Sequence, residues 1–203
     1  MVDSLTKQKE EMAKFQETEM LKHLDLKYKN EIIRSMEWLG EKDDTIFMGQ
    51  AVKYSGNAMY NTTKTIDDNK KIELPVFEDV QMGMSLGLAL NGFVPVTCFP
   101  RFDFLICAMN QLVNHVDKMR QMSRGEVKPR IIIRTSIGSK NPLDGGPQHT
   151  QDFTIAMKKS LKEVKVIFLN KPEMIFSSFK KAYEDKESYS YLFVEHGDFY
   201  NDK

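Results

Sequence analysis

Short apolar runs alternate with segments of helical periodicity along most of this chain. Five runs have the length and composition of buried strands, and they read T-I-F-M-G-Q, F-V-P-V-T-C-F-P, R-I-I-I-R-T, V-K-V-I-F-L and S-Y-L-F-V-E. The helices expected around them cover residues 28–39, the stretch after Pro75, and residues 101–121, 151–161 and 172–184. Because crossovers between parallel strands are right-handed, this alternation predicts a three-layer α/β/α domain with a mostly parallel sheet.

The first 27 residues differ from the rest of the chain in lacking strand signals. They are rich in Lys, Glu, Met and Leu, and a helix over about residues 4–23 is so polar that we expect a solvated or partner-bound arm. The remainder is long enough for one substantial core. We therefore predict an N-terminal helical arm (1–27) and a single domain (28–203).

The charge balance limits the classes of partner. The 29 basic residues equal the 29 acidic ones, whereas a nucleic-acid or membrane-surface partner favours a basic excess. No apolar run approaches the length of about 18 residues that spans a bilayer, and the N-terminus lacks the apolar run of a signal peptide. With only two cysteines, Cys98 and Cys107, the sequence indicates a soluble protein of the reduced cytoplasm whose partners are small molecules and proteins.

One carboxylate stands where an extended segment turns into an apolar helix. Glu78 lies in L-P-V-F-E-D-V-Q-M-G-M-S-L-G-L-A-L-N-G, whose helical part is apolar on nearly every side and so belongs in a core or at an interface. A buried carboxylate without a partner favours its protonated, hydrogen-bond-donating form, which can address a ring nitrogen. Glu78 is therefore the first candidate for chemistry.

Two glycines on the same helix mark a contact. Gly83 and Gly87 stand four residues apart, so they share one face and let another backbone come close. The run is too short for the membrane-spanning use of this spacing. We predict tight packing against a neighbouring helix, with a subunit boundary as its place.

Common catalytic and metal signatures are missing: there is no Walker loop, G-x-G-x-x-G, H-E-x-x-H or C-x-x-C. The four histidines, at positions 23, 115, 149 and 196, are too scattered for a metal site. His149 follows G-G-P-Q in a loop after a strand, where backbone can approach a ligand. His149 is either a functional residue or an ordinary loop residue. The polar loop at residues 53–71 is likewise either functional or a simple connector.

Five segments, in order and at similar spacing, resemble one known family. They are P-V-F-E-D-V-Q-M-G-M-S-L-G-L-A-L-N-G, F-P-R-F-D-F, N-Q-L-V-N-H-V-D-K, P-R-I-I-I-R-T-S-I-G and G-G-P-Q-H-T-Q. Together they resemble the pyrimidine-binding domain of thiamine-diphosphate enzymes. The closest likeness is to the β subunit of the decarboxylating component of 2-oxo acid dehydrogenases, and transketolases are more distant. The resemblance runs from Tyr28 to Glu195.

The resemblance implies a role for four residues. Glu78 matches the family's acid, which hydrogen-bonds the N1′ nitrogen of the aminopyrimidine and activates the cofactor towards the carbonyl of a 2-oxo acid or ketose. Phe104 matches the aromatic ring against the aminopyrimidine, although an ordinary core aromatic is the alternative. Val76 matches a residue that lines the pyrimidine pocket, and His149 matches the histidine on the thiazolium and substrate side.

Three positions depart from the family pattern. Asp79 places a second carboxylate beside Glu78, where it either raises the proton affinity of the first or points to solvent. Gln50 and Asn110 stand where the family often has acidic residues. A proton relay between paired active sites through these positions is therefore not expected.

The family resemblance also implies a partner. The diphosphate and Mg²⁺ bind a different domain in this family, so we expect a pyrimidine-domain subunit that shares a thiamine-diphosphate site with a separate diphosphate-domain subunit in an α2β2 assembly. Its reaction is then decarboxylation of a 2-oxo acid. The alternatives are ketol transfer by a split transketolase, or a non-catalytic interaction subunit that keeps the fold.

Overall fold

The structure is a computed structural model that describes residues 27–141 and 143–201. Six strands form one sheet in the order β2-β1-β3-β4-β6-β5, and every neighbouring pair is parallel. The strands are β1 (Thr45–Gly49), β2 (Lys71–Glu73), β3 (Val94–Phe99), β4 (Ile132–Ile137), β5 (Lys165–Phe168) and β6 (Tyr191–His196). The α-helices are α2 (Tyr28–Gly40), α3 (Tyr60–Thr63), α4 (Glu78–Leu90), α5 (Phe102–Leu105), α6 (Asp117–Met122), α7 (Thr154–Ser160) and α8 (Pro172–Glu184).

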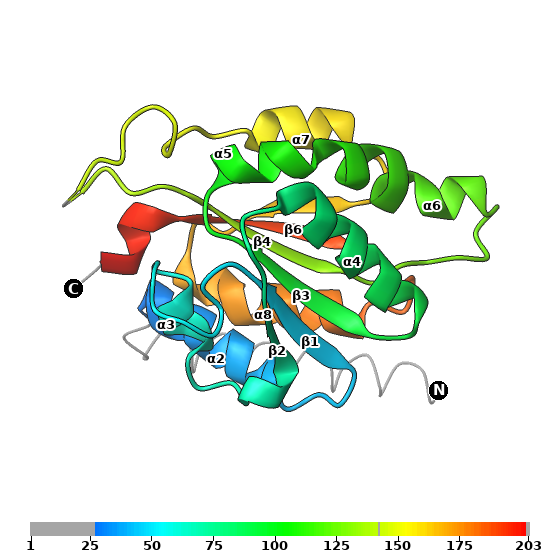
Figure 1. The fold of residues 1–203 in the computed structure, drawn as a ribbon, viewed down its shortest axis with the longest axis horizontal. Coiled ribbons are helices and arrows are strands. Elements are labelled where there is room, and N and C mark those ends of the chain that lie inside the picture. Colours follow the sequence, from blue (N-terminus) through cyan, green and yellow to red (C-terminus); the bar gives the residue numbers. More distant parts are fainter. Residues whose placement is uncertain (1–26, 142, 202–203) are drawn as a thin grey trace, which may run out of the picture.

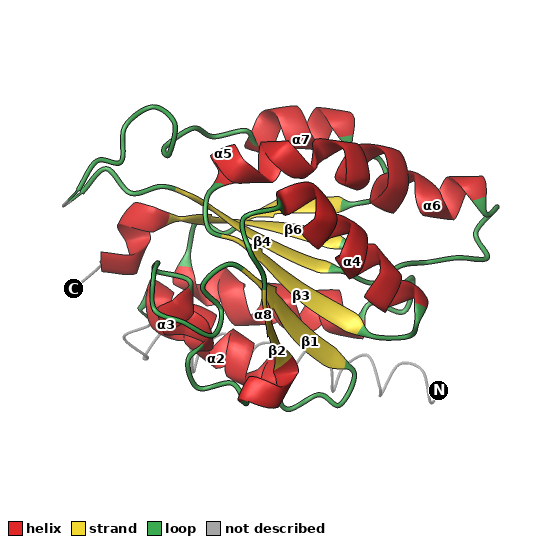
Figure 2. Ribbon diagram, viewed as in Figure 1, coloured by secondary structure: helices red, strands yellow, loops and turns green. Residues whose placement is uncertain are grey.

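Helices cover both faces of the sheet. Figures 1 and 2 show α2, α3 and α8 on one side and α4, α5, α6 and α7 on the other. Neighbouring strand residues point into two separate apolar cores: Ile132 and Phe193 belong to the core under α2 and α8, whereas Ile133 and Leu192 belong to the core under α4. Both faces are therefore buried, and the predicted three-layer α/β/α fold is confirmed.

The helix expected at residues 101–121 is wrong in detail. The chain follows a helical path there, but its hydrogen bonding changes from α5 through a 3₁₀ turn (Ile106–Ala108) and a π-helix (Asn110–Val116) to α6. The spacing of the buried residues explains the change. Phe102, Leu105 and Ala108 are three residues apart, whereas Ala108, Leu112 and Val116 are four residues apart. A tighter turn suits the first spacing and a wider turn the second.

Two other boundaries differ from the sequence prediction. The helix expected at residues 151–161 begins only at Thr154, whose backbone N–H donates to Oδ1 of Asp152 at 2.8 Å. The polar loop at 53–71 contains α3 and leads into β2, an edge strand too short and polar to predict. The N-terminal helical arm lies outside the described residues.

Candidate functional site

The predicted site residues follow the carboxyl ends of four neighbouring strands. Glu78 opens α4 after β2, and Gln50 follows β1. Phe104 lies in α5 after β3, and His149 lies in the loop after β4. These strands are adjacent in the sheet, in the order β2-β1-β3-β4. Ligands of open parallel sheets bind at this edge, so the fold carries these residues to the place where a site is expected.

Glu78 is buried but not alone. It is only 9% exposed, and its Oε1 accepts a hydrogen bond from Nε2 of Gln50 at 3.2 Å. Within the described part of the chain its Oε2 has no hydrogen-bond partner. Because Glu78 is the first residue of α4, the helix dipole also favours negative charge there. One carboxylate oxygen is thus held, and the other is free to meet a ligand.

The second carboxylate, Asp79, is directed away from this contact. Its Oδ2 accepts a hydrogen bond from Nε2 of Gln111 at 3.3 Å, which joins α4 to the π-helix. The Asp79 side chain therefore neither points freely into solvent nor pairs with Glu78, the two possibilities that the sequence left open. Asp79 tethers two helices beside the site.

Phe104 and His149 meet although they are far apart in sequence. Their rings contact edge to face with centroids 5.4 Å apart and planes at 83°. Two glycines permit the approach: a Cβ on Gly138 would lie 1.9 Å from the carbonyl oxygen of His149, and one on Gly145 would lie 2.9 Å from the His149 Cβ. The Nδ1 atom of His149 is buried without a hydrogen-bond partner in the described residues.

The surface just before Glu78 is apolar and open. Val76 is 76% exposed and Phe77 is 59% exposed, although both are large apolar side chains. Val76 therefore stands beside the candidate acid, but the described chain covers it on no more than one side. An apolar surface of this kind, next to a buried acid, is typical of a site completed by another molecule or chain.

A cavity of about 310 Å³ adjoins the His149 loop at the ends of β4, β5 and β6. It is lined by Ile137, Gly138, Lys140, Thr150, Asp152, Phe168, His196 and Asp198. The Asp198 carboxylate accepts hydrogen bonds from the backbone N–H groups of Lys140 and Asn141, at 2.8 and 2.9 Å, and so fixes the mouth of the cavity. The sequence did not indicate His196 or Asp198 as site residues.

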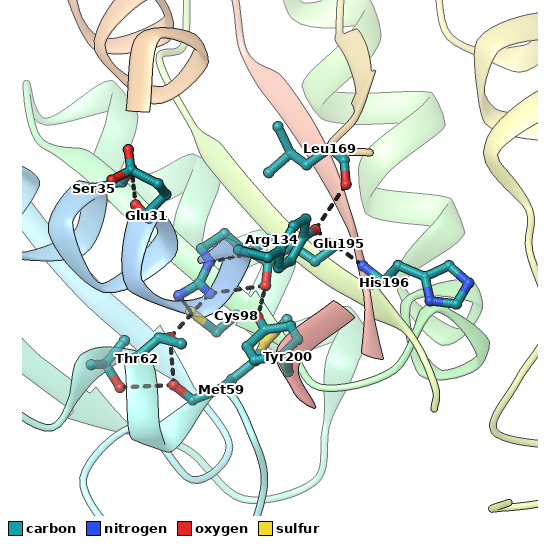
Figure 3. Close-up of polar contacts among 12 residues, drawn as sticks. Glu31, Ser35, Met59, Thr62, Cys98, Arg134, Leu169, Glu195, His196 and Tyr200 are labelled. Atoms are coloured by element: carbon teal, nitrogen blue, oxygen red, sulfur yellow. Dashed lines mark hydrogen bonds and ion pairs between the residues drawn. The ribbon is translucent and has the colours of Figure 1, made fainter. Parts of the chain in front are cut away.

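Sequence reasoning also missed a buried polar cluster around Arg134 (Figure 3). Arg134 on β4 donates to Glu195 on β6 through Nε at 2.7 Å and Nη2 at 3.1 Å, and Nη2 also donates to Oγ1 of Thr62 at 3.1 Å. The hydroxyl of Tyr200 donates to Glu195. The only signal in the sequence was one charged residue in each of two apolar strands, Arg134 in one and Glu195 in the other.

The charges of this cluster are fixed by their surroundings. Burial alone lowers the pKa of Arg134, but the adjacent Glu195 carboxylate raises it above its usual value. Burial raises the pKa of Tyr200, and the Glu195 charge adds to that shift, so the phenol stays protonated and donates. Burial likewise raises the pKa of the Cys98 thiol to about 11. The Arg134 guanidinium therefore stays charged, and its hydrogen bond to Thr62 ties the polar loop to the sheet.

Among residues 27–141 and 143–201, no group of three or more His, Cys, Asp or Glu side chains could hold a metal ion. Over the same residues, no helix combines the length and the apolar character needed to cross a membrane.

The fold and the site together define an α/β domain that presents a carboxylate, an aromatic ring and an imidazole at the carboxyl edge of a parallel sheet. Residues 30–200 match the family model described as the transketolase, pyrimidine binding domain. The chain therefore belongs to the family of transketolase pyrimidine-binding domains. The resemblance noted in the sequence is confirmed.

Two similar proteins carry the name of a β subunit. The pyruvate dehydrogenase E1 component subunit beta of Gracilaria tenuistipitata var. liui is 28% identical over 166 residues, which cover 79% of this chain and 50% of that protein. The mitochondrial subunit of the same name from Saccharomyces cerevisiae is 31% identical over 123 residues, 58% of this chain and 32% of that protein. The chain thus spans half or less of the length of these relatives.

Two solved structures share the fold at low sequence identity. A split-gene transketolase, in an inactive β4 tetramer, superposes with a TM-score of 0.62 and 16% identity over 83% of this chain and 50% of that one. A transketolase from Campylobacter jejuni superposes with a TM-score of 0.63 and 13% identity over 84% of this chain and 26% of that one. These likenesses support the fold.

Proposed function

We propose that this chain is the pyrimidine-domain subunit of a thiamine-diphosphate enzyme that decarboxylates a 2-oxo acid. The observation that carries the proposal is the position of Glu78: a buried acid with one held and one free oxygen, at the carboxyl edge of a transketolase-type domain. The names of the relatives, all pyruvate dehydrogenase β subunits among those described above, support the 2-oxo acid as substrate class.

The residues present fit the aminopyrimidine half of the cofactor. The free Oε2 of Glu78 can address a ring nitrogen, the ring of Phe104 offers an apolar surface, and His149 has an unpartnered Nδ1. When bound, thiamine diphosphate supplies the electron sink for loss of the substrate carboxylate. Its diphosphate and Mg²⁺ are assigned by this proposal to a partner subunit.

Each residue then has one task. Glu78 presents Oε2 to the N1′ nitrogen of the aminopyrimidine and can hold or move a proton there. Phe104 packs against the same ring and excludes water from it, with Val76 as a further wall once a partner covers it. His149, which Phe104 contacts at its edge, faces the thiazolium and substrate side and can hold or move a proton there.

We also propose two kinds of contact with other chains. A diphosphate-domain subunit covers the open surface at Val76 and Phe77, and a second copy of this chain packs against α4, to give an α2β2 assembly. The β-subunit names of the relatives and the split gene of one solved neighbour support a partner. A compartment with reduced thiols, the cytoplasm in our proposal, fits the two free cysteines, Cys98 and Cys107.

Two other functions are consistent with the family. Ketol transfer by a split enzyme is favoured by the two transketolase neighbours in structure. A non-catalytic subunit is favoured by Gln50 and Asn110, which replace acidic residues with amides. Turnover of a ketose donor would identify ketol transfer. A complex that binds the cofactor without any turnover would identify a non-catalytic subunit.

The test measures thiamine-diphosphate binding and turnover in mixtures. The chain is co-expressed with a candidate partner that carries a diphosphate-binding motif, and calorimetry measures cofactor binding to each chain and to the mixture. We expect binding by the mixture only, and loss of 2-oxo acid turnover by about 100-fold or more in Glu78→Gln. The neighbouring carboxylate provides the control, since Asp79→Asn should retain most of the activity. Full turnover in Glu78→Gln would refute the proposal.

A further inference from the structure

The backbone at the end of β1 and just after it has a conformation that few residues adopt. Gly49 has a φ of +146° and Ala51 has a φ of +51°. Alanine in the left-handed region is strained by its Cβ, and such residues persist where the surrounding contacts hold them. Gln50, which donates to Glu78, stands between these two positions. The direction of its side chain therefore depends on what fixes the backbone on both sides.

Glu73 provides most of that fixation. At the end of β2, its carboxylate accepts hydrogen bonds from three successive backbone N–H groups, those of Ala51 at 2.5 Å, Val52 at 2.9 Å and Lys53 at 2.7 Å. The next residue, Leu74, donates from its own backbone N–H to the carbonyl oxygen of Gly49 at 2.9 Å. Hydrogen bonds to a carboxylate are about twice as strong as neutral ones. The backbone on both sides of Gln50 is thus held by contacts from the end of β2, and the carbonyl oxygen of Gln50 itself accepts a hydrogen bond from Nδ2 of Asn57 at 3.4 Å.

The side chain of Gln50 has the chemistry of a fixed donor. Its Nε2 donates to Oε1 of Glu78, and an amide neither gains nor loses a proton near neutral pH. Donation to Oε1 fixes the rotation of the carboxylate and leaves Oε2 for the ligand. A glutamate in the same place would set two carboxylates against each other, and a methionine would keep the length and lose the donor.

We propose that Gln50 orients the carboxylate of Glu78 and that Glu73 is a positioning residue that acts through Gln50. The proposal rests on the function proposed above, in which Glu78 faces the cofactor. The competing explanation is that Glu73 only stabilises a loop. The chain offers a matched case of that kind, since Asp117 accepts hydrogen bonds from the successive backbone N–H groups of residues 162, 163 and 164. Residues 162–164 directly precede β5, so this contact lies at the amino end of a strand, whereas Glu73 lies at the carboxyl end of one.

The first experiment needs no partner. In ¹⁵N–¹H spectra of the full chain, the side-chain amide signals of Gln50 are assigned by their loss in Gln50→Met. We expect Glu78→Gln and Glu73→Ala to shift or broaden these signals, and Asp117→Ala to leave them in place. Glu73→Gln serves as a second variant if Glu73→Ala does not fold. Signals that stay at their wild-type positions in the folded Glu73 variant would overturn the proposal.

The second experiment is a double-mutant cycle on turnover by the complex with the diphosphate-domain subunit. We expect Gln50→Met and Glu73→Ala each to lower kcat by about tenfold with a smaller change in KM, and the double variant to be no slower than Gln50→Met alone. Multiplied losses in the double variant would show that Glu73 does not act through Gln50.

The controls separate the two proposals. If Glu78→Gln keeps full turnover, the proposed function fails. If Glu78→Gln abolishes turnover while Gln50→Met and Glu73→Ala behave as wild type, the function stands and the positioning role of Glu73 fails.

Discussion

Arg134 on β4 and Glu195 on β6 form a two-bond ion pair that is closed to solvent, with 0% exposure of both side chains. Thr62 accepts a further hydrogen bond from the guanidinium, and Tyr200 donates one to the carboxylate. The pair therefore joins two strands, the polar loop after β1 and the turn after β6 (Figure 3). Each charge is balanced by the other, and Thr62 and Tyr200 add one hydrogen bond each.

Removing one charge from this cluster should destabilise the protein strongly. Glu195→Ala leaves a buried guanidinium without its partner, and we expect a loss of about 3–5 kcal/mol in the free energy of unfolding. Urea unfolding followed by circular dichroism measures it. The control is the double variant Arg134→Met with Glu195→Leu, which buries no charge and should lose less than the single variant. An equal or larger loss in the double variant would contradict this account.

Five strands of the sheet could be predicted because each of them is a local apolar run, whereas the polar edge strand β2 and the Arg134–Glu195 pair could not. The local sequence does not indicate that β4 lies beside β6, so the sequence does not show that the single charges in these two runs form a pair. The same limit applies to the site. Glu78, Phe104 and His149 were found by motif, but the contact from Gln50 spans 28 residues and depends on the unusual backbone at Gly49 and Ala51.

Gly49 should tolerate no side chain. Its φ is +146°, and an added Cβ would lie 2.3 Å from the backbone carbonyl oxygen of Cys98 on the neighbouring strand. We expect Gly49→Ala to lower the free energy of unfolding by about 2 kcal/mol or more. The matched control is Gly87→Ala, because Gly87 is in the α4 interior and an added Cβ meets nothing within 4 Å. That change should stabilise the protein by about 0.5–1 kcal/mol.

These two glycine variants are compared in the same urea titration. The physical reason for their difference is the location of the new methyl group, in contact with backbone at position 49 and in open space at position 87. If both variants lose stability equally, the close approach of β1 to β3 at Gly49 is wrong.

Asp117 should make stability depend on pH in the acid range. Burial alone would raise the pKa of this carboxyl, but the hydrogen bonds from Lys118 and from three backbone N–H groups lower it below its usual value. Because the folded pKa lies below the unfolded one, the contribution is fully present above pH of about 4 and is lost as pH falls through the folded pKa.

The measurement compares wild type with Asp117→Asn by urea unfolding between pH 2 and 7, a range set by the ordinary carboxyl pKa of about 4. The variant should be less stable near neutral pH, and the gap should close as the pH falls below about 4. A gap that stays constant down to pH of about 2 would show that the charge of Asp117 does not stabilise the fold.

The outer face of α4 should mediate self-association. Val80, Met84 and Gly87 follow one another at helical spacing, and the first two are large apolar side chains exposed by 43% and 39%. A Cβ added to Gly83 would lie 3.6 Å from Cδ of Gln111 in the same chain, whereas one added to Gly87 would meet nothing within 4 Å, so only Gly87 of the predicted glycine pair opens outward. A second α4 can therefore approach at Gly87 and cover the apolar side chains.

We expect Met84→Lys to shift the chain towards the monomer in size-exclusion chromatography with light scattering, because it places a charge in the centre of this face. The thermal midpoint should change little, since Met84 is partly exposed in the single chain. Met122→Lys is the matched control: Met122 is also exposed, by 60%, but lies at the end of α6. If Met84→Lys has the same mass as wild type and Met122→Lys, the contact lies elsewhere on the molecule.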